Sequence, residues 1–228
     1  MEKLVYFSWR KPGVAIEDYR QQLIEAAAPR LVAAGAKRLE LQLSDLLGGM
    51  PKPMLLMGEG ATLSAAVSFW LDCYDAHAAI EAVLRGASER LDGYLVTESV
   101  PQPCVDRDWP DGARSPGVTH FTWFEKPGAI SDEEFFHAWH DVHTPFSFEL
   151  HPLRWSYVRN SVVRALTPGS RPIRAIVAER FRTLLDYTDP KRLFGSKQAL
   201  ARSGADVTHY ADAARLHSVP LSEFILRS

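Results

Sequence analysis

The chain carries the same short pattern twice, about half its length apart. Residues 6–13 read YFSWRKPG and residues 120–128 read HFTWFEKPG. Each copy is an apolar run that ends in Lys-Pro-Gly, and each is followed by an acidic helix start and then by a proline, Pro29 or Pro145. A repeat with this offset is typical of a duplicated unit, so the 228-residue chain must adopt a fold that two similar halves can build together.

The composition narrows the classes of protein and partner. The chain is 46% hydrophobic and 24% charged, as in globular proteins, and it is long enough to bury a large core. A net charge of −2 argues against binding to nucleic acid or to an anionic membrane surface, which both require dense positive charge. Two cysteines, Cys73 and Cys104, form no disulfide framework. Without a signal-peptide pattern or an apolar run of about 18 residues, we expect a cytoplasmic protein.

The first half, residues 1–100, has the predicted order β-α-β-β-α-β. Alternating apolar residues predict the strands, apolar residues at helical spacing predict the helices, and Pro29 should kink or divide the first helix. The loop 44–60 is rich in Gly and Met, and it is either a lid over a ligand or a plain connector. The predicted strands are 3–10, 39–43, 65–71 and 94–100, and the predicted helices are 16–34 and 75–91.

The same order is predicted again in residues 118–228. A Pro- and Gly-rich linker, 101–117, separates the halves. Ser131 and Glu134 have the spacing of a capping box and mark the start of a helix. The predicted strands are 118–124, 155–160, 173–184 and 221–226, and helical segments are predicted after Ser131, over 190–203 and around 207–216.

Two β-α-β-β-α-β units predict an α+β fold made of two ferredoxin-like halves. Each half would have an antiparallel sheet with helices on one face and an apolar face that needs a partner. The two sheets could pack face to face into a pseudo-symmetric barrel within one chain. We therefore expect either a monomer with this pseudo-dimeric barrel or a homodimer of it.

The second half resembles the EthD family of the dimeric α+β barrel superfamily. The resemblance rests on Lys126-Pro127-Gly128, Glu134-Phe135, Trp139, His143 and Thr144-Pro145-Phe146. Aligning Pro29 with Pro145 places Leu23 opposite Trp139 and Ala27 opposite His143, so the first half departs from the family pattern. The resemblance implies a degenerate first half and an active second half.

The superfamily also implies a range of reactions. It includes cofactor-free polyketide cyclases, decarboxylases, dehydratases and isomerases, as well as haem enzymes. We expect chemistry without a cofactor. A haem held by His143 or His140 is an alternative, and the spacing of His137, His140 and His143 does not by itself form a tetrahedral metal site.

Three residues are predicted to be catalytic. His143 is the first choice because imidazole titrates near neutral pH, although a core histidine bonded to a backbone carbonyl is the alternative. Strand alternation places His120, Thr122 and Phe124 on one face, so His120 is either a site residue or a polar strand end. Tyr157 could supply a hydroxyl group.

Aromatic richness predicts a planar apolar ligand, although core packing explains the same residues. Tyr6 is the first-half counterpart of His120. It could be a hydrogen-bond donor in a cavity on the opposite side of the fold, in the first half. His209 and Tyr210 could border a cavity. The predicted substrate-binding residues are Trp139, Phe135, Phe146, Arg159 and Tyr6.

These observations predict a lyase, cyclase or isomerase that moves protons on an aromatic or polyketide-like small molecule, such as an intermediate in the breakdown of aromatic compounds. The alternatives are a hydrophobic-ligand-binding protein without turnover and a haem-binding enzyme.

Overall fold

The computed structural model describes residues 1–50 and 55–228. Eight strands form one closed barrel in the order β1-β3-β2-β8-β5-β7-β6-β4, and every neighbouring pair is antiparallel. The strands are β1 Glu2–Arg10, β2 Lys37–Leu43, β3 Ala65–Leu71, β4 Ser88–Gln102, β5 Val118–Phe124, β6 Arg154–Ala165, β7 Ala175–Phe181 and β8 Leu216–Ile225.

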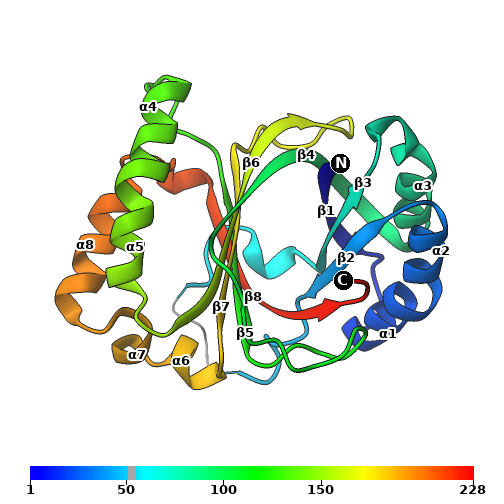
Figure 1. Cartoon of the computed structure of the whole chain (residues 1–228), viewed down its shortest axis with the longest axis horizontal. Coiled ribbons are helices and arrows are strands. Elements are labelled where there is room, and N and C mark those ends of the chain that lie inside the picture. Colours follow the sequence, from blue (N-terminus) through cyan, green and yellow to red (C-terminus); the bar gives the residue numbers. More distant parts are fainter. Residues whose placement is uncertain (51–54) are drawn as a thin grey trace.

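Helices cover the barrel on two opposite sides (Figure 1). On one side lie α1 Ile16–Gln21, α2 Ala28–Ala33 and α3 His77–Ala87. On the other side lie α4 Asp132–Phe136, α5 Thr144–Leu150, α6 Leu184–Thr188, α7 Pro190–Phe194 and α8 Lys197–Val207. None of the helices in residues 1–50 and 55–228 is long and apolar enough to cross a membrane.

The prediction of two ferredoxin-like halves is wrong. Strands of the two halves are hydrogen-bonded to each other at two seams, β2 with β8 and β4 with β6. The fold is therefore one closed antiparallel sheet, not two half-sheets that face each other. Closure gives each of these strands a neighbour on both sides, so none of them presents an open edge.

Part of the barrel interior is an apolar core built from alternate residues of the strands. Phe7 lies at its centre, with its ring centroid 5.6 Å from that of Phe121 and 5.2 Å from that of Trp123. Both contacts are edge-to-face, an arrangement that aromatic rings favour. The strands of both halves therefore share one core.

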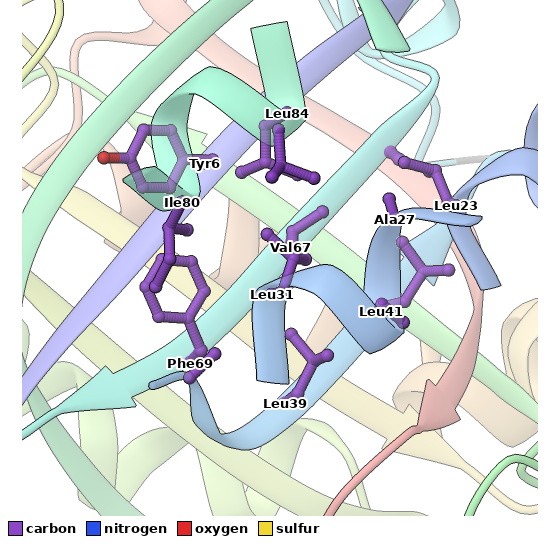
Figure 2. Packing of buried hydrophobic residues seen from close by; sticks show 14 of the residues in the cluster. Tyr6, Leu23, Ala27, Leu31, Leu39, Leu41, Val67, Phe69, Ile80 and Leu84 are labelled. Atoms are coloured by element: carbon purple, nitrogen blue, oxygen red, sulfur yellow. The ribbon is translucent and has the colours of Figure 1, made fainter. Parts of the chain in front are cut away.

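The helices of the first half pack tightly against the outer face of the barrel (Figure 2). Leu23 and Ala27, the counterparts of Trp139 and His143, are both buried in this layer. Tyr6 lies beside Phe69, with stacked rings 5.8 Å apart. Apolar side chains thus fill the region of the first half that corresponds to the candidate site of the second.

Pro29 and Pro145 divide their helices in the same way. Each lies in the first turn of a helix, α2 or α5, and each helix follows a π-helical segment, Gln22–Ala27 or His137–His143. Proline has no N–H to donate to the preceding turn, so the regular i to i−4 pattern is interrupted there. The capping box of Ser131 and Glu134 is also confirmed.

Several helices and strands begin or end at other residues than predicted. The helix predicted to end at residue 91 ends at Ala87, because β4 starts at Ser88, and β4 continues to Gln102 at the start of the predicted linker. The helix predicted over 190–203 is two helices, since Gly195 adopts φ +68° and Ser196 caps α8. Around 207–216, the only helix after α8 in the described structure is a short 3-10 turn, Ala213–Arg215.

Candidate functional site

A cavity of about 250 Å³ lies between the second half's helices and the outer face of β5, β6 and β7. We call it the helix-side cavity. Its polar lining includes His120, His143, His151, Tyr157 and Glu179. Its apolar lining includes Leu55, Met57, Phe124, Trp139, Val177, Phe194, Leu200, Val207 and Leu216. An apolar pocket with a few converging polar groups is the usual form of a small-molecule site.

Strand β5 supplies part of this wall through its alternation. His120, Thr122 and Phe124 line the helix-side cavity, whereas Phe121 and Trp123 point into the barrel core. The predicted division of this strand into two faces is confirmed. Both faces of the strand are buried, one by the helices of the second half and the other by the barrel core.

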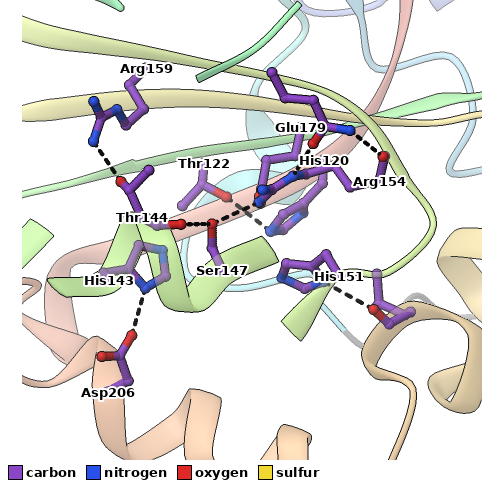
Figure 3. A network of polar contacts seen from close by, with 12 residues as sticks. His120, Thr122, His143, Thr144, Ser147, His151, Arg154, Arg159, Glu179 and Asp206 are labelled. Carbon is purple, nitrogen blue, oxygen red and sulfur yellow. Dashed lines mark hydrogen bonds and ion pairs between the residues drawn. The ribbon is translucent and has the colours of Figure 1, made fainter. Parts of the chain in front are cut away.

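His143 is paired with a carboxylate that the sequence did not single out. Its Nδ1 lies 2.5 Å from Oδ2 of Asp206 in α8, and both side chains are mostly buried (Figure 3). With the Nδ1–H donated to Asp206, Nε2 carries the free lone pair. The carboxylate is 63 residues away along the chain, so no local pattern could have indicated it.

Tyr210 lies beside the same imidazole. Its hydroxyl oxygen is 3.2 Å from Nδ1 and 3.3 Å from Nε2 of His143. An oxygen nearly equidistant from the two nitrogens cannot lie along the in-plane lone pair of either one. The lone pair of Nε2 is therefore not blocked by Tyr210. The structure places Tyr210 at the helix-side cavity and His209 at a separate surface depression.

His120 is a buried, neutral imidazole. Its Nε2 lies 3.0 Å from the hydroxyl of Thr122, and its Nδ1 lies 3.3 Å from the hydroxyl of Tyr187. Burial lowers the pKa of His120 to about 4, although Glu179 acts in the opposite direction. At neutral pH this ring can donate one N–H to a ligand or to a neighbouring hydroxyl.

Glu179 and Arg154 form a buried ion pair in the cavity wall. Nη1 of Arg154 lies 2.5 Å from Oε1 of Glu179 and 3.1 Å from Oγ of Ser147 (Figure 3). Burial alone would raise the pKa of Glu179, but Arg154, His151 and His120 outweigh it and hold this pKa at about 2. Sequence reasoning missed this pair, because a Glu inside an apolar strand gives no sign of its partner.

His151 is a second missed residue of the wall. Its Nδ1 donates to the backbone carbonyl of Leu193, 3.0 Å away, which assigns the lone pair to Nε2. Burial lowers the pKa of His151. Nothing in the sequence around it, between helix α5 and strand β6, distinguishes it from a loop histidine.

Tyr157 lies in the wall of the helix-side cavity. Burial, together with the nearby charge of Glu179, raises the pKa of Tyr157 to about 12. The phenol therefore keeps its proton at neutral pH and can donate it in a hydrogen bond.

The other predicted binding residues lie outside the cavity lining, apart from Trp139. Phe135 packs behind Trp139, with ring centroids 5.5 Å apart. Phe146 borders a surface depression, and Arg159 lies over Trp139 and donates to Thr144. Tyr6 is on the opposite side of the barrel, 3.3 Å from Glu81. These placements separate the predicted residues into a cavity group and a packing group.

Two observations concern the alternatives of a metal site or a haem site. Among the described residues, no group of three or more His, Cys, Asp or Glu is arranged to hold a metal ion. The helix-side cavity, at about 250 Å³, lies below the ~300–1,000 Å³ typical of small-molecule and cofactor sites, so it suits a small aromatic molecule better than a macrocycle of the size of haem. Of the loop 44–60, Leu55 and Met57 line the cavity, and residues 51–54 lie outside the described residues.

Comparisons with known proteins identify the fold. No family model matches the chain, and no curated protein matches it in sequence. A candidate monooxygenase from Fusobacterium nucleatum superposes with a TM-score of 0.56 at 10% identity, over 98% of this chain and 91% of that one. An anthrone oxidase-like protein superposes with a TM-score of 0.54 at 11% identity, over 100% of this chain and 93% of that one. At these identities the likeness concerns the fold alone.

Proposed function

We propose that this protein is an acid–base enzyme that moves a proton on an aromatic or polyketide-like small molecule in the helix-side cavity. The observation that carries this proposal is the His143–Asp206 pair at the edge of a cavity with an apolar wall. The EthD resemblance of residues 126–146 favours the same side of the barrel.

The proposed first step is proton abstraction by His143. Asp206 holds the imidazole through Nδ1, so Nε2 is the basic atom. It would take a proton from a carbon next to a carbonyl group or from a phenol. The pairing resembles the arrangement by which a carboxylate orients a catalytic histidine and stabilises its charged form.

The negative charge that develops on the substrate needs hydrogen-bond donors. Tyr157 is protonated at neutral pH because its pKa is about 12, and the neutral ring of His120 has one N–H, which would exchange its contact with the hydroxyl of Thr122 or Tyr187 for the substrate oxygen. Donors held in place inside a buried cavity stabilise an oxyanion more than the same groups do in water. We assign Tyr157 and His120 to this role.

The charges of the wall favour a neutral substrate. Arg154 and Glu179 compensate each other, and burial keeps His120 neutral. No unpaired cation therefore faces the cavity from among these residues to attract a carboxylate. We expect phenols, enones or polyketide-like ketones to bind better than aromatic acids, and dehydration, aldol-type closure or isomerisation to be favoured over decarboxylation.

A second candidate reaction is oxygenation without a cofactor. The fold neighbours are described as a monooxygenase and an anthrone oxidase-like protein. A carbanion formed by His143 could react with O₂, so that a CH₂ group and O₂ become a C=O group and water. Consumption of O₂ during turnover would distinguish this reaction from a lyase or isomerase reaction.

The test starts with thermal shifts of the wild-type protein against neutral phenols, ketones and the matching acids. A ligand at 100 times its Kd should add about 2.7 kcal/mol of stability. Compounds that bind are then incubated with the protein, and products are followed by mass spectrometry together with O₂ uptake. Binding without any product would support a non-catalytic binding protein instead.

The variants test the roles of the two paired residues. We expect His143→Ala to remove nearly all turnover and Asp206→Asn to lower kcat/KM by about 100-fold or more, because the imidazole loses its orienting partner. Asp141→Asn is the matched control, since Asp141 pairs with the exposed His137 on the same helix at 3.2 Å. Wild-type turnover in His143→Ala would refute the assignment.

A further inference from the structure

The inside of the barrel contains a second cavity, which we call the lumen cavity. Its volume is about 230 Å³, and the sheet separates it from the helix-side cavity. On β7, for example, Ile176 and Ala178 line the lumen cavity, whereas Val177 and Glu179 line the helix-side cavity. The lumen cavity has no part in the function proposed above.

Charged residues point into the lumen cavity, and one of its carboxyl groups has no cation beside it among the described residues. Lys3 pairs with Glu98, and Arg180 pairs with Glu223 at 3.0 Å. Glu40 also lines this cavity, but no cation of the described residues lies within ion-pair distance of it. The hydroxyl of Ser68 donates a hydrogen bond to Oε2 of Glu40, with the two oxygens 3.4 Å apart. Burial raises the pKa of Glu40, and the charges of Glu223 and Glu98 act in the same direction against that of Lys3, so this carboxyl group needs a further cation beside it to stay ionised.

Two amide oxygens in the same cavity have no hydrogen-bond partner among the described residues. They are Oε1 of Gln42, whose residue is 7% exposed, and Oδ1 of Asn160, whose residue is 4% exposed. The NH₂ group of Asn160 donates to the carbonyl of Ile176, which leaves its oxygen as the free end. A buried acceptor without a donor lowers stability because its desolvation is not compensated, so a ligand with N–H groups would stabilise the site.

These acceptors lie on opposite walls of the cavity. Glu40 and Gln42 are two residues apart on β2, on the same face of the strand, and Asn160 is on β6. In the closed order of eight strands, β2 and β6 are four positions apart, which places them across the barrel from each other. A ligand between them can therefore reach donors and acceptors on both sides at once.

The remaining lining is apolar and partly open to solvent. Val5, Phe121 and Ile176 form the inner part, and Val100 and Cys104 lie at the exposed end. A ligand that fills this space needs an apolar body as well as a polar group. A positively charged donor would satisfy the free acceptors and would keep the carboxyl group of Glu40 ionised.

We propose that the lumen cavity binds a small organic ammonium ion with an apolar body. Its ammonium group would donate to Glu40 and to the amide oxygens of Gln42 and Asn160, and its body would lie against Phe121. This site is independent of the His143 chemistry, since it lies on the other face of the sheet.

The test uses the intact protein and 2-phenylethylammonium chloride, measured by isothermal titration calorimetry. We expect saturable binding, and about 10-fold or more weaker binding of 2-phenylethanol and 3-phenylpropionate, which lack the charged donor. Glu40→Gln should raise the Kd of the ammonium ion by about 10-fold or more. Glu133→Gln makes the same chemical change at an exposed carboxylate outside the lumen cavity, so it should leave the Kd unchanged.

A labelling experiment tests the location without altering the lumen. The chain has two cysteines, so the Cys73→Ser variant keeps a single thiol, that of Cys104. Cys104 lines the lumen cavity. The ammonium ion should slow the reaction of Cys104 with a maleimide dye, and His143→Ala should not change the Kd.

Four results would overturn the proposal, and three of them concern the lumen cavity itself. They are equal binding of the alcohol and the ammonium ion, unchanged binding in a folded Glu40→Gln protein, and no protection of Cys104. Loss of binding in His143→Ala alone would place the amine in the helix-side cavity and would also overturn it.

Discussion

Three histidines line the helix-side cavity, and their rings have three different partners. His120 contacts the hydroxyls of Thr122 and Tyr187, and His151 donates to a backbone carbonyl. Of these three described residues, His143 alone pairs with a carboxylate, that of Asp206. Burial lowers the pKa of His120 and of His151, so both are poor bases at neutral pH. The partners of each ring, not the residue type, assign the role of base to His143.

The neutral state of His120 predicts a pH dependence of stability. Its pKa is about 4 in the folded protein and near its ordinary value of 6.5 in the unfolded chain. Between these values the unfolded state binds more protons, so the free energy of unfolding falls as the pH falls. The loss from His120 approaches about 3 kcal/mol at pH 4.

Urea denaturation at pH 7, 5.5 and 4.5 checks this prediction. His120→Asn lacks the titrating group, so its free energy of unfolding should fall less steeply than that of the wild type. Parallel curves for the two proteins would contradict the buried, neutral state of His120. Glu179, with a folded pKa of about 2, acts at lower pH, because its stabilisation is lost as the pH falls from about 4.5 toward 2.

At the scale of elements, the π-helical segment before each proline is the feature that the two halves share. In the second half, the N–H of Thr144 and its hydroxyl both donate to the carbonyl of Trp139. This wide turn sets the angle between Trp139 and His143, which both line the cavity. Pro145 helps to maintain it, since a residue with an N–H could restore the regular α-helical pattern.

We therefore expect Pro145→Ala to lower kcat/KM by about 10-fold or more while it changes the free energy of unfolding by less than about 1 kcal/mol. Pro29→Ala is the matched control, because Pro29 follows the equivalent π-helical segment in the packed first half. It should have a similar effect on stability and none on activity. Equal loss of activity in both variants would show that the turn has no specific role at the site.

At the scale of the whole molecule, the barrel depends on hydrogen bonds between the two halves. The seams β2–β8 and β4–β6 close the sheet, and the apolar part of the interior contains side chains of both halves. A chain of residues 118–228 alone would expose the open edges of β6 and β8 and one side of this core. Such edges and apolar faces associate readily.

We expect this fragment to form no stable monomer, and to aggregate or to pair with a second copy. Size-exclusion chromatography and thermal melting of the fragment, with the full chain as the control, check this. A monomeric fragment with a cooperative melt would mean that the second half folds independently and that the seams are not required.

Much of the local structure followed from the sequence. Periodicity located all the strands to within a few residues at most ends, and it divided β5 into its two faces. The Ser131–Glu134 spacing marked the start of α4, and the two prolines marked where helices divide. These features depend on interactions between residues close together in the chain. The sequence also pointed to His143, His120, Tyr157 and Trp139, which the fold brings to one cavity.

Only the tertiary structure decided the closure of the sheet and the partners within the cavity. Strand periodicity says which face of a strand is buried but not which strand lies next to it, so two half-sheets and one closed barrel have the same pattern. Asp206 and Glu179 contact the site from segments far from His143 in sequence, and His151 reaches it from the turn that follows α5. The same holds for the position of Glu40 away from any cation, which depends on which side chains meet inside the barrel. The sequence alone determined the elements and the first base candidate, because these depend on local spacing, and the fold determined what each buried group contacts.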